Sequence, residues 1–264
     1  MKEIHIMNHA VLAARAALFN ISHSQIMMHK KDLSPVTLAD LTVNQQLKEI
    51  LLGSFSDYGW LSEETQDDFS RLNKKRVFIV DPIDGTKEYI HHISEYVISI
   101  ALVEDGEPLC AVILNPATSE HFYAIKGQGA YLNQQPIRCH AHIENKLTVL
   151  ASRSEVKKGH WQPFTDHFTV KPTGSIAYKL ALLAASHAHA TLSLTPKNEW
   201  DIAAGVLLVK EAGGIVHDLD KKPFVFNQKN TLVNGIIASH ANAYQHVIMV
   251  LDQSKNYQAC DNSF

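Results

Sequence analysis

Cysteine is scarce in this 264-residue chain, and its placement excludes several kinds of site. The three cysteines, Cys110, Cys139 and Cys260, are an odd number, lie far apart and form no Cys-x-x-Cys pair. A disulfide framework or a thiolate metal site would require paired or closely spaced cysteines. The pattern is typical of a protein that folds in a reducing compartment.

The chain also lacks the long apolar segments of membrane and secreted proteins. No apolar run approaches the length of a transmembrane helix. The first 19 residues include Glu3, Asn8 and Arg15, and they lack the basic start and unbroken apolar core of a signal peptide. We therefore expect a cytoplasmic protein without a transmembrane segment, and peripheral association with the inner membrane stays open as an alternative.

An excess of positive charge is absent as well. The chain has 24 lysines and arginines against 27 aspartates and glutamates, which gives a net charge of -3. Proteins that bind nucleic acid through their surface charge present a basic field, which this balance does not supply. Nucleic acid is therefore not an expected partner.

Two helices are predicted near the N-terminus. The first covers residues 4–21, and the second starts in the Ser-Pro-Val-Thr sequence of residues 34–37, with proline in its first turn, and runs to about residue 53. Asp40 lies three residues before Val43 and seven before Leu47, so it shares their inward face. A carboxylate on that face requires a partner or a function.

The rest of the chain predicts strands first and then strands alternating with helices. Residues 76–80 predict a buried strand, residues 96–132 an antiparallel meander, and the segments after residue 146 alternate as strand 147–151, helix 176–189, strand 190–194 and helix 201–212. This order predicts a layered α/β protein with an α+β first half. We place an N-terminal half at residues 1–135 and a C-terminal half at residues 136–264, and expect a tight interface between them.

The most informative segment is Asp-Pro-Ile-Asp-Gly-Thr at residues 81–86, directly after the predicted buried strand. Pro82 is expected to end the strand pairing, and Gly85 allows a sharp turn. Both Asp81 and Asp84 are then held at the mouth of one strand. Two carboxylates this close repel each other unless a cation neutralises them, so the segment predicts a site for a hard cation.

Two further acidic positions belong to the same hypothesis. Glu63 and Glu64 follow the Tyr-Gly-Trp-Leu-Ser segment of residues 58–62, and Asp201 opens a predicted helix. Taken singly, an acidic pair is usually a solvated loop and an aspartate at a helix start is usually a cap. Solvation does not explain the proline and glycine around Asp81 and Asp84, so we interpret the acidic positions together as one constellation.

Four sequence blocks resemble the inositol monophosphatase superfamily of magnesium-dependent, lithium-sensitive phosphatases. They occur in the family's order within residues 30–240: Ser-Pro-Val-Thr-Leu-Ala-Asp at 34–40, Leu-Ser-Glu-Glu at 61–64, Asp-Pro-Ile-Asp-Gly-Thr at 81–86 and Trp-Asp-Ile-Ala-Ala-Gly at 200–205. The resemblance implies a five-layer α-β-α-β-α sandwich and, as in many members of the superfamily, a homodimer. It also implies a small-molecule phosphate ester as the substrate.

The resemblance assigns roles to the matching positions. It implies that two or three Mg²⁺ ions, which Mn²⁺ can replace, are held by Glu63, Asp81, Asp84, Asp201 and the backbone carbonyl of Ile83. It implies that Thr86, paired with Asp40, orients the attacking water, and that Glu63 helps to position it. Substrate contacts are expected from the metal-site residues Glu63, Ile83, Asp84 and Asp201, from Gly85 and Thr86, and from Gly174 and Ser175 at the start of a later helix. The oxygen-only ligand set itself favours Mg²⁺ or Mn²⁺ over zinc.

The residues after the motif favour one branch of the superfamily. Lys-Glu-Tyr-Ile at residues 87–90 resembles the CysQ-type 3'(2'),5'-bisphosphate nucleotidases, which implies hydrolysis of the 3'-phosphate of adenosine 3',5'-bisphosphate to AMP. Two features depart from that branch. The segment Thr-Pro-Lys-Asn-Glu at residues 195–199, before Trp200, differs from the nucleotidase form. Bacterial nucleotidases tend to have a lysine where Tyr178 stands, and Lys179 follows one position later, about 100° further around a helix. An inositol-1-monophosphatase or a related sugar-phosphate phosphatase is therefore the alternative.

Other function classes have weaker sequence support. The 16 histidines show no zinc-ligand spacing, and Gly127-Gln-Gly129 lacks the third glycine of a dinucleotide fingerprint, so we interpret it as a hairpin or bulge. A nicotinamide-dependent oxidoreductase is thereby disfavoured. A non-catalytic phosphate- or cation-binding protein would be expected to have lost a ligand or the water-orienting pair, and neither is missing from this sequence.

Overall fold

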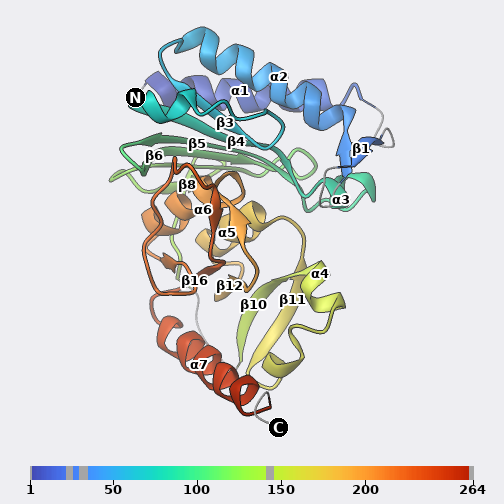
Figure 1. Ribbon diagram of the computed structural model, residues 1–264, viewed down its shortest axis with the longest axis vertical. Helices are drawn as coiled ribbons and strands as arrows, with labels where there is room; N and C mark the ends of the chain where they lie inside the picture. The colour runs from blue at the N-terminus through green and yellow to red at the C-terminus, as the bar shows by residue number, and fades with distance from the viewer. Residues whose placement is uncertain (1, 22–25, 30–34, 141–145, 262–264) are drawn as a thin grey trace.

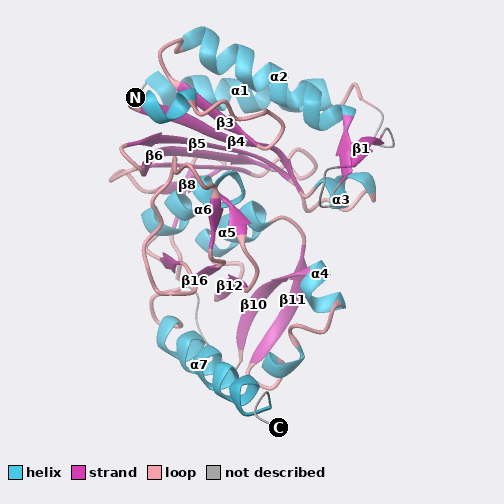
Figure 2. Cartoon of the chain, in the orientation of Figure 1, coloured by secondary structure: helices cyan, strands magenta, loops and turns pink. Residues whose placement is uncertain are grey.

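The computed structural model describes residues 2–21, 26–29, 35–140 and 146–261. Figures 1 and 2 show a layered molecule in which helices and sheets alternate from the N-terminus at the top to the C-terminus at the bottom. The predicted helix start at Ser34 lies outside the described residues, but the rest of that helix is described.

Two long helices form the first layer. They are α1 (Lys2–Leu18) and α2 (Leu38–Ser54), and they lie side by side over one face of a sheet (Figure 1). Pro35 was expected in the first turn of α2, which is wrong, because Pro35–Thr37 forms the short strand β2 and pairs with β1 (Ile26–His29). Thr37 caps α2 in a capping box with Asp40, a type of cap that contributes about 1 kcal/mol.

The second layer is a seven-stranded sheet with the order β3-β4-β5-β6-β7-β8-β9. Its strands are β3 (Gly59–Ser62), β4 (Arg76–Asp84), β5 (Val97–Glu104), β6 (Glu107–Leu114), β7 (His121–Ile125), β8 (Ala130–Leu132) and β9 (Gln135–Ile137). The 3-10 turn Ser70–Asn73 connects β3 with β4. The predicted antiparallel meander is confirmed, and Gly127 and Gly129 lie in the turn between β7 and β8.

The strand that ends in the Asp-Pro-Ile-Asp motif is longer than predicted. β4 pairs with β5 from Arg76 to Asp81, skips Pro82 and Ile83, and resumes at Asp84 opposite Val97. Pro82 therefore interrupts the ladder instead of ending it, since it has no N–H to donate. This irregularity separates Asp81 from Asp84 by a local bend, which is a common feature of strands near active sites. Gly85 has φ +100°, and α3 (Thr86–Ile90) begins directly after it.

Two central helices form the third layer. They are α5 (Ile176–Ala184) and α6 (Glu199–Glu211), and both are almost entirely buried. One apolar core joins them to the inner face of the seven-stranded sheet and to Val216, Ile236 and Ala238 of the next sheet. Because one sheet covers α6 on each side, the helix has apolar residues on most of its surface.

The fourth layer is a five-stranded sheet with the order β11-β10-β12-β16-β14. Its strands are β10 (Leu147–Ser152), β11 (Phe168–Thr173), β12 (Ala190–Ser193), β14 (Ile215–His217) and β16 (Ile236–Ser239). A two-stranded sheet of β13 (Lys197–Asn198) and β15 (Leu232–Val233) lies beside α6. The fifth layer contains α7 (Tyr244–Asp261) at the bottom of Figure 1, while α4 (Arg153–Lys157) and the 3-10 turn Gln162–Phe164 flank β10 and β11.

The five-layer α-β-α-β-α architecture is thus confirmed. Three apolar cores fill the spaces between the layers: one between α1 and α2 and the first sheet, one around α5 and α6, and one between the second sheet and α7. The division at residue 135 stays a prediction. Within the described residues, no helix is long and apolar enough to cross a membrane.

The contact between α5 and α6 supplies a prediction for stability. A Cβ added at Gly205 would lie 2.6 Å from the Cβ of Leu180, which no side-chain rotation can relieve. We expect Gly205→Ala to lower the free energy of unfolding by about 1–3 kcal/mol, the usual cost of overpacking. Denaturant unfolding measures this change.

Gly53→Ala is the matched control, because Gly53 lies in α2 with nothing within 4 Å of an added Cβ. That variant is expected to be neutral or more stable by about 0.5–1 kcal/mol, the helical advantage of alanine over glycine. Equal destabilisation by both variants would contradict the close α5–α6 contact.

Candidate active site

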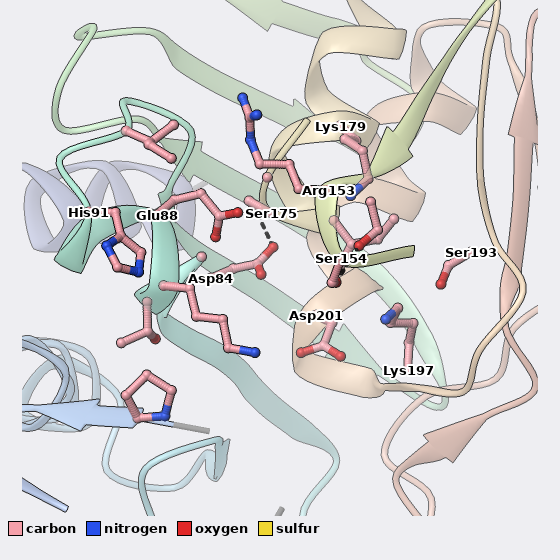
Figure 3. A pocket seen from close by; sticks show the side chains of 18 of the residues that line it. Asp84, Glu88, His91, Arg153, Ser154, Ser175, Lys179, Ser193, Lys197 and Asp201 are labelled. Atoms are coloured by element: carbon pink, nitrogen blue, oxygen red, sulfur yellow. Dashed lines mark hydrogen bonds between the residues drawn. The ribbon is translucent and has the colours of Figure 1, made fainter. Parts of the chain in front are cut away.

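A cavity of about 540 Å³ lies where the ends of several layers meet. Figure 3 shows its lining: Asp84, Glu88 and His91 on one side, Lys179, Ser193 and Lys197 on the other, and Asp201 below. The lining comes from both sheets and from the central helices. Residues far apart in the sequence therefore meet in one place.

Three acidic side chains form the closest group. Oxygen atoms of Glu63, Asp81 and Asp201 all lie within 4.8 Å of one another, and this is the sole group of its kind in the part of the chain that the structure describes. Glu63 follows β3, Asp81 lies in the neighbouring strand β4, and Asp201 lies in the first turn of α6. Parallel pairing of β3 with β4 brings the first two together, and α6 points its N-terminus at them.

Burial and mutual repulsion act on this group. Asp81 is 1% exposed. Burial raises its pKa well above the ordinary value, and the nearby carboxylates of Glu63, Asp84 and Asp201 raise it further. Burial, followed by Asp84 and Glu63, raises the pKa of Asp201 to about 8. Both shifts have the same physical cause, because uncompensated negative charge is unfavourable in a water-poor site.

Each of three aspartates has one carboxylate oxygen held by the protein. Asp81 Oδ1 accepts the Ile83 N–H at 3.0 Å, and Asp201 Oδ2 accepts the Asn198 N–H at 2.8 Å. Asp84 Oδ2 accepts the N–H of Ala177 at 2.7 Å in the first turn of α5. The second oxygen of each aspartate accepts no hydrogen bond from the described residues. Fixed carboxylates with an available oxygen suit a hard cation, which prefers several oxygen ligands.

The predicted pair of Asp40 and Thr86 is present in the structure. Thr86 Oγ1 lies 3.1 Å from Asp40 Oδ1, although the two residues are 46 positions apart. Asp40 is 1% exposed, which confirms its predicted inward position. The N–H and the hydroxyl of Thr37 donate to Asp40 Oδ2 at 2.7 and 2.6 Å. The capping box of α2 therefore fixes the carboxylate that Thr86 contacts.

Gly174 and Ser175 lie at the cavity, but their contacts differ from those expected. The Ser175 hydroxyl donates to Asp84 Oδ2 at 2.6 Å, so it holds an acidic residue of the cavity. The Gly174 N–H donates to Glu95 Oε2 at 2.6 Å. Ser175 has φ +54°, a region that non-glycine residues rarely occupy and that is common at functional sites.

Comparison with known proteins identifies the family. The chain matches the inositol monophosphatase family over residues 4–255. It belongs to that family. It is 30% identical to the 3'(2'),5'-bisphosphate nucleotidase CysQ of Haemophilus influenzae over 97% of this chain and 96% of that protein. It is 36% identical to the Nus factor SuhB of Xylella fastidiosa, over 69% of this chain and 66% of that protein.

A solved structure of an inositol monophosphatase has the same fold as this chain. An IMPase from Thermotoga maritima superposes with a TM-score of 0.84 at 26% identity, covering 97% of this chain and 99% of that one. The protein is therefore a phosphatase of the inositol monophosphatase family. The family is generally metal-dependent, and the acidic group of Glu63, Asp81 and Asp201 is the corresponding feature of this chain.

Tyr178, which stands where nucleotidases of this family tend to have a lysine, forms a hydrogen bond away from the cavity. The Tyr178 hydroxyl donates to Glu120 at 2.6 Å, and Tyr178 does not line the cavity. Lys179 does line it, and it is 3% exposed. The helical offset of one residue thus directs Lys179 toward the cavity.

Several cavity residues were missed by the sequence reasoning. Arg153 forms two hydrogen bonds to Glu95, at 2.8 and 2.9 Å, and so links α4 to the segment before β5. Ser193 and Lys197 also line the cavity. Their positions give a signal for them: Arg153 directly follows β10, Ser193 is the last residue of β12, and Lys197 lies in β13 just before α6. Their residue types alone gave no motif.

Proposed function

We propose that this protein is a Mg²⁺-dependent phosphatase that removes the 3'-phosphate of adenosine 3',5'-bisphosphate, with AMP as the product. The observation that supports the hydrolytic part most directly is the group of clustered carboxylates, with Asp81 buried among them, beside the Thr86–Asp40 hydrogen bond. One part of the structure thus has oxygen ligands for a cation, and the part next to it has a hydroxyl that can orient water.

The donor set fits a divalent hard cation. Glu63, Asp81, Asp84 and Asp201, with the carbonyl oxygen of Ile83, would hold Mg²⁺ and are equally suited to Mn²⁺. When bound, the cation supplies charge neutralisation for the phosphate and a lower pKa for water. Burial and the neighbouring carboxylates raise the pKa values of Asp81 and Asp201, and a bound cation would offset this repulsion.

The protein's own groups would orient the attacking water. Thr86 Oγ1 lies 3.1 Å from both Asp40 Oδ1 and the Ile83 carbonyl oxygen. A hydroxyl has one proton, and a carboxylate is the stronger acceptor, so Thr86 donates to Asp40. Its oxygen is then an acceptor for a proton of water, which turns a lone pair of the water toward phosphorus. Glu63 would accept the second proton.

The phosphate is expected near the start of α3. Gly85 and Thr86 open this helix directly after Asp84, and both line the cavity. Backbone N–H groups at a helix start favour anions, although a helix of five residues contributes little by itself. The cation and these N–H groups together would hold the transferred group in place, which is the main requirement of phosphoryl transfer.

Two observations favour a nucleotide bisphosphate as the substrate. The similarity to the Haemophilus nucleotidase extends over nearly the whole of both chains. The Lys-Glu-Tyr segment after Thr86 resembles that branch, and Lys87 and Glu88 both line the cavity. The substrate would then extend from the acidic group past these residues.

Inositol 1-phosphate, or a related sugar phosphate, is the second candidate. Tyr178 in place of the expected lysine favours it, as does the close superposition with the Thermotoga IMPase. The same acidic group and Thr86–Asp40 pair would serve either ester, because both would act on the phosphate group that the two esters share.

Phosphate release from adenosine 3',5'-bisphosphate and from inositol 1-phosphate, measured side by side with Mg²⁺ and then with EDTA, tests the proposal. We expect a higher kcat/KM for the nucleotide and loss of both activities with EDTA. Equal or faster turnover of the inositol ester would rule out the nucleotidase assignment, and activity that survives EDTA would rule out the metal-dependent mechanism.

A change at Thr86 tests the orientation of water. Thr86→Ala is expected to lower kcat by roughly 10²-fold, the usual cost of misplacing a reacting group, with KM nearly unchanged. Thr86→Ser keeps the hydroxyl and is the matched control, expected to retain most of the activity. Wild-type turnover in Thr86→Ala would contradict the assigned role.

A further inference from the structure

Lys179 is a buried cation without an ion pair. It is 3% exposed and lines the cavity, yet its one hydrogen bond to a described residue is long, 3.3 Å from Nζ to the carbonyl oxygen of Thr173. It forms no salt bridge within the described residues. An ammonium group has three protons to donate, and a buried charge is unfavourable unless it is paired. Burial accordingly lowers the pKa of Lys179 to about 8.

A second unpaired cation lies beside it. Lys197 lines the same side of the cavity (Figure 3), and its Nζ reaches only the hydroxyl of Thr195 at 3.4 Å. Lys197 is close enough to contribute to the lowered pKa of Lys179. Two like charges near each other raise the cost of leaving both without an anion.

The carboxylates near the two lysines have other partners or belong to the acidic side of the cavity, as does Asp201, on which Lys197 acts through space. Glu155 accepts hydrogen bonds from Ser193, Thr195 and the indole N–H of Trp161, at 3.0 to 3.2 Å. Asp84 is held by the start of α5 and belongs to the acidic side. Glu88 also acts on Lys179 through space, but it lies across the cavity from it (Figure 3). None of these carboxylates forms a salt bridge with either lysine.

We propose that Lys179 and Lys197 bind a second phosphate group of the substrate while the phosphate to be hydrolysed lies at the acidic group. The unpaired lysines and the acidic aspartates line one cavity, so a single small molecule can contact both. In adenosine 3',5'-bisphosphate the second group is the 5'-phosphate. Lys179 thereby supplies the positive charge that the family's nucleotidases place one position earlier in the sequence.

This inference rests on the proposed function and extends it to substrate selection. It predicts a preference for bisphosphates over the corresponding monophosphates. Adenosine 3',5'-bisphosphate and 3'-AMP contain the same ester to be cleaved and differ only in the 5'-phosphate. Their comparison therefore isolates the lysine pair from the metal chemistry.

The experiment measures kcat/KM for both nucleotides in the wild type, Lys179→Met and Lys197→Met. Each variant is expected to lower kcat/KM for the bisphosphate by about 10- to 100-fold, the range for a hydrogen bond to a charged group. The value for 3'-AMP is expected to change by less than about twofold. Lys158→Met is the matched control, because Lys158 directly follows α4, is exposed and lies outside the cavity lining, so the change should leave both substrates unaffected.

A binding measurement gives a readout independent of turnover. AMP contains the 5'-phosphate and lacks the scissile ester, so it is expected to raise the melting temperature of the wild type and of Lys158→Met. The rise should be smaller in Lys179→Met and Lys197→Met. Equal losses for both nucleotides, no loss for either, or an unchanged response to AMP would overturn the assignment of the lysine pair.

Failure of the nucleotidase proposal is distinguishable from failure of this inference. If the wild type prefers inositol esters, inositol 1-phosphate and inositol 1,4-bisphosphate replace the nucleotides in the same comparison. A loss confined to the bisphosphate in the lysine variants would then support the second phosphate site without the nucleotide assignment. Equal effects on the two inositol esters would overturn it.

Discussion

The repulsion among clustered carboxylates is the constraint on which the rest of the active site depends. Glu63, Asp81 and Asp201 converge from three elements, and Asp84 adds a fourth negative charge nearby. The fold accepts this arrangement because its layers are held by three separate apolar cores. Burial of these cores favours folding by far more than the repulsion opposes it, so the fold can keep these carboxylates close together.

Helix starts place most of the acidic side chains. Asp40 and Asp201 each occupy the third position of a capping box, so the ordinary capping role and the functional role belong to the same residue. Asp84, at the end of β4, accepts hydrogen bonds from the Ser175 hydroxyl and the Ala177 N–H at the start of α5. Backbone hydrogen bonds of this kind fix one oxygen of a carboxylate at little conformational cost, and so orient the other.

Local patterns predicted many of the strands and helices and the pair of Asp81 and Asp84, while the resemblance to the family predicted the five layers and the full acidic group. Strand 76–80, the meander and the helix containing Asp40 follow from periodicity, and Asp81 with Asp84 follows from the residues between them. Contacts between distant segments could not be predicted in this way. No local pattern indicates that Ser175 would hold Asp84, or that Arg153 would pair with Glu95, since these contacts arise from the packing of the two sheets.

The sequence also could not predict that basic side chains line the cavity opposite the acidic group. Lys179 stands one position from the expected lysine, and only the direction of α5 shows that it faces the cavity while Tyr178 turns toward Glu120. A cation bound at one side and a phosphate bound at the other would complete the electrostatics of the site. The substrate would then be selected by charge at both of its ends.

The central claim is that the acidic group of Glu63, Asp81 and Asp201 is a cation site. Melting temperatures of the wild type and Asp81→Asn, measured in EDTA and in saturating Mg²⁺, test it most directly. Since Asp81 is destabilised by burial and by its neighbours, the account predicts that Asp81→Asn is the more stable protein in EDTA. It also predicts that Mg²⁺ raises the melting temperature of the wild type and has a much smaller effect on the variant. A wild-type melting temperature that does not respond to Mg²⁺ would contradict the account.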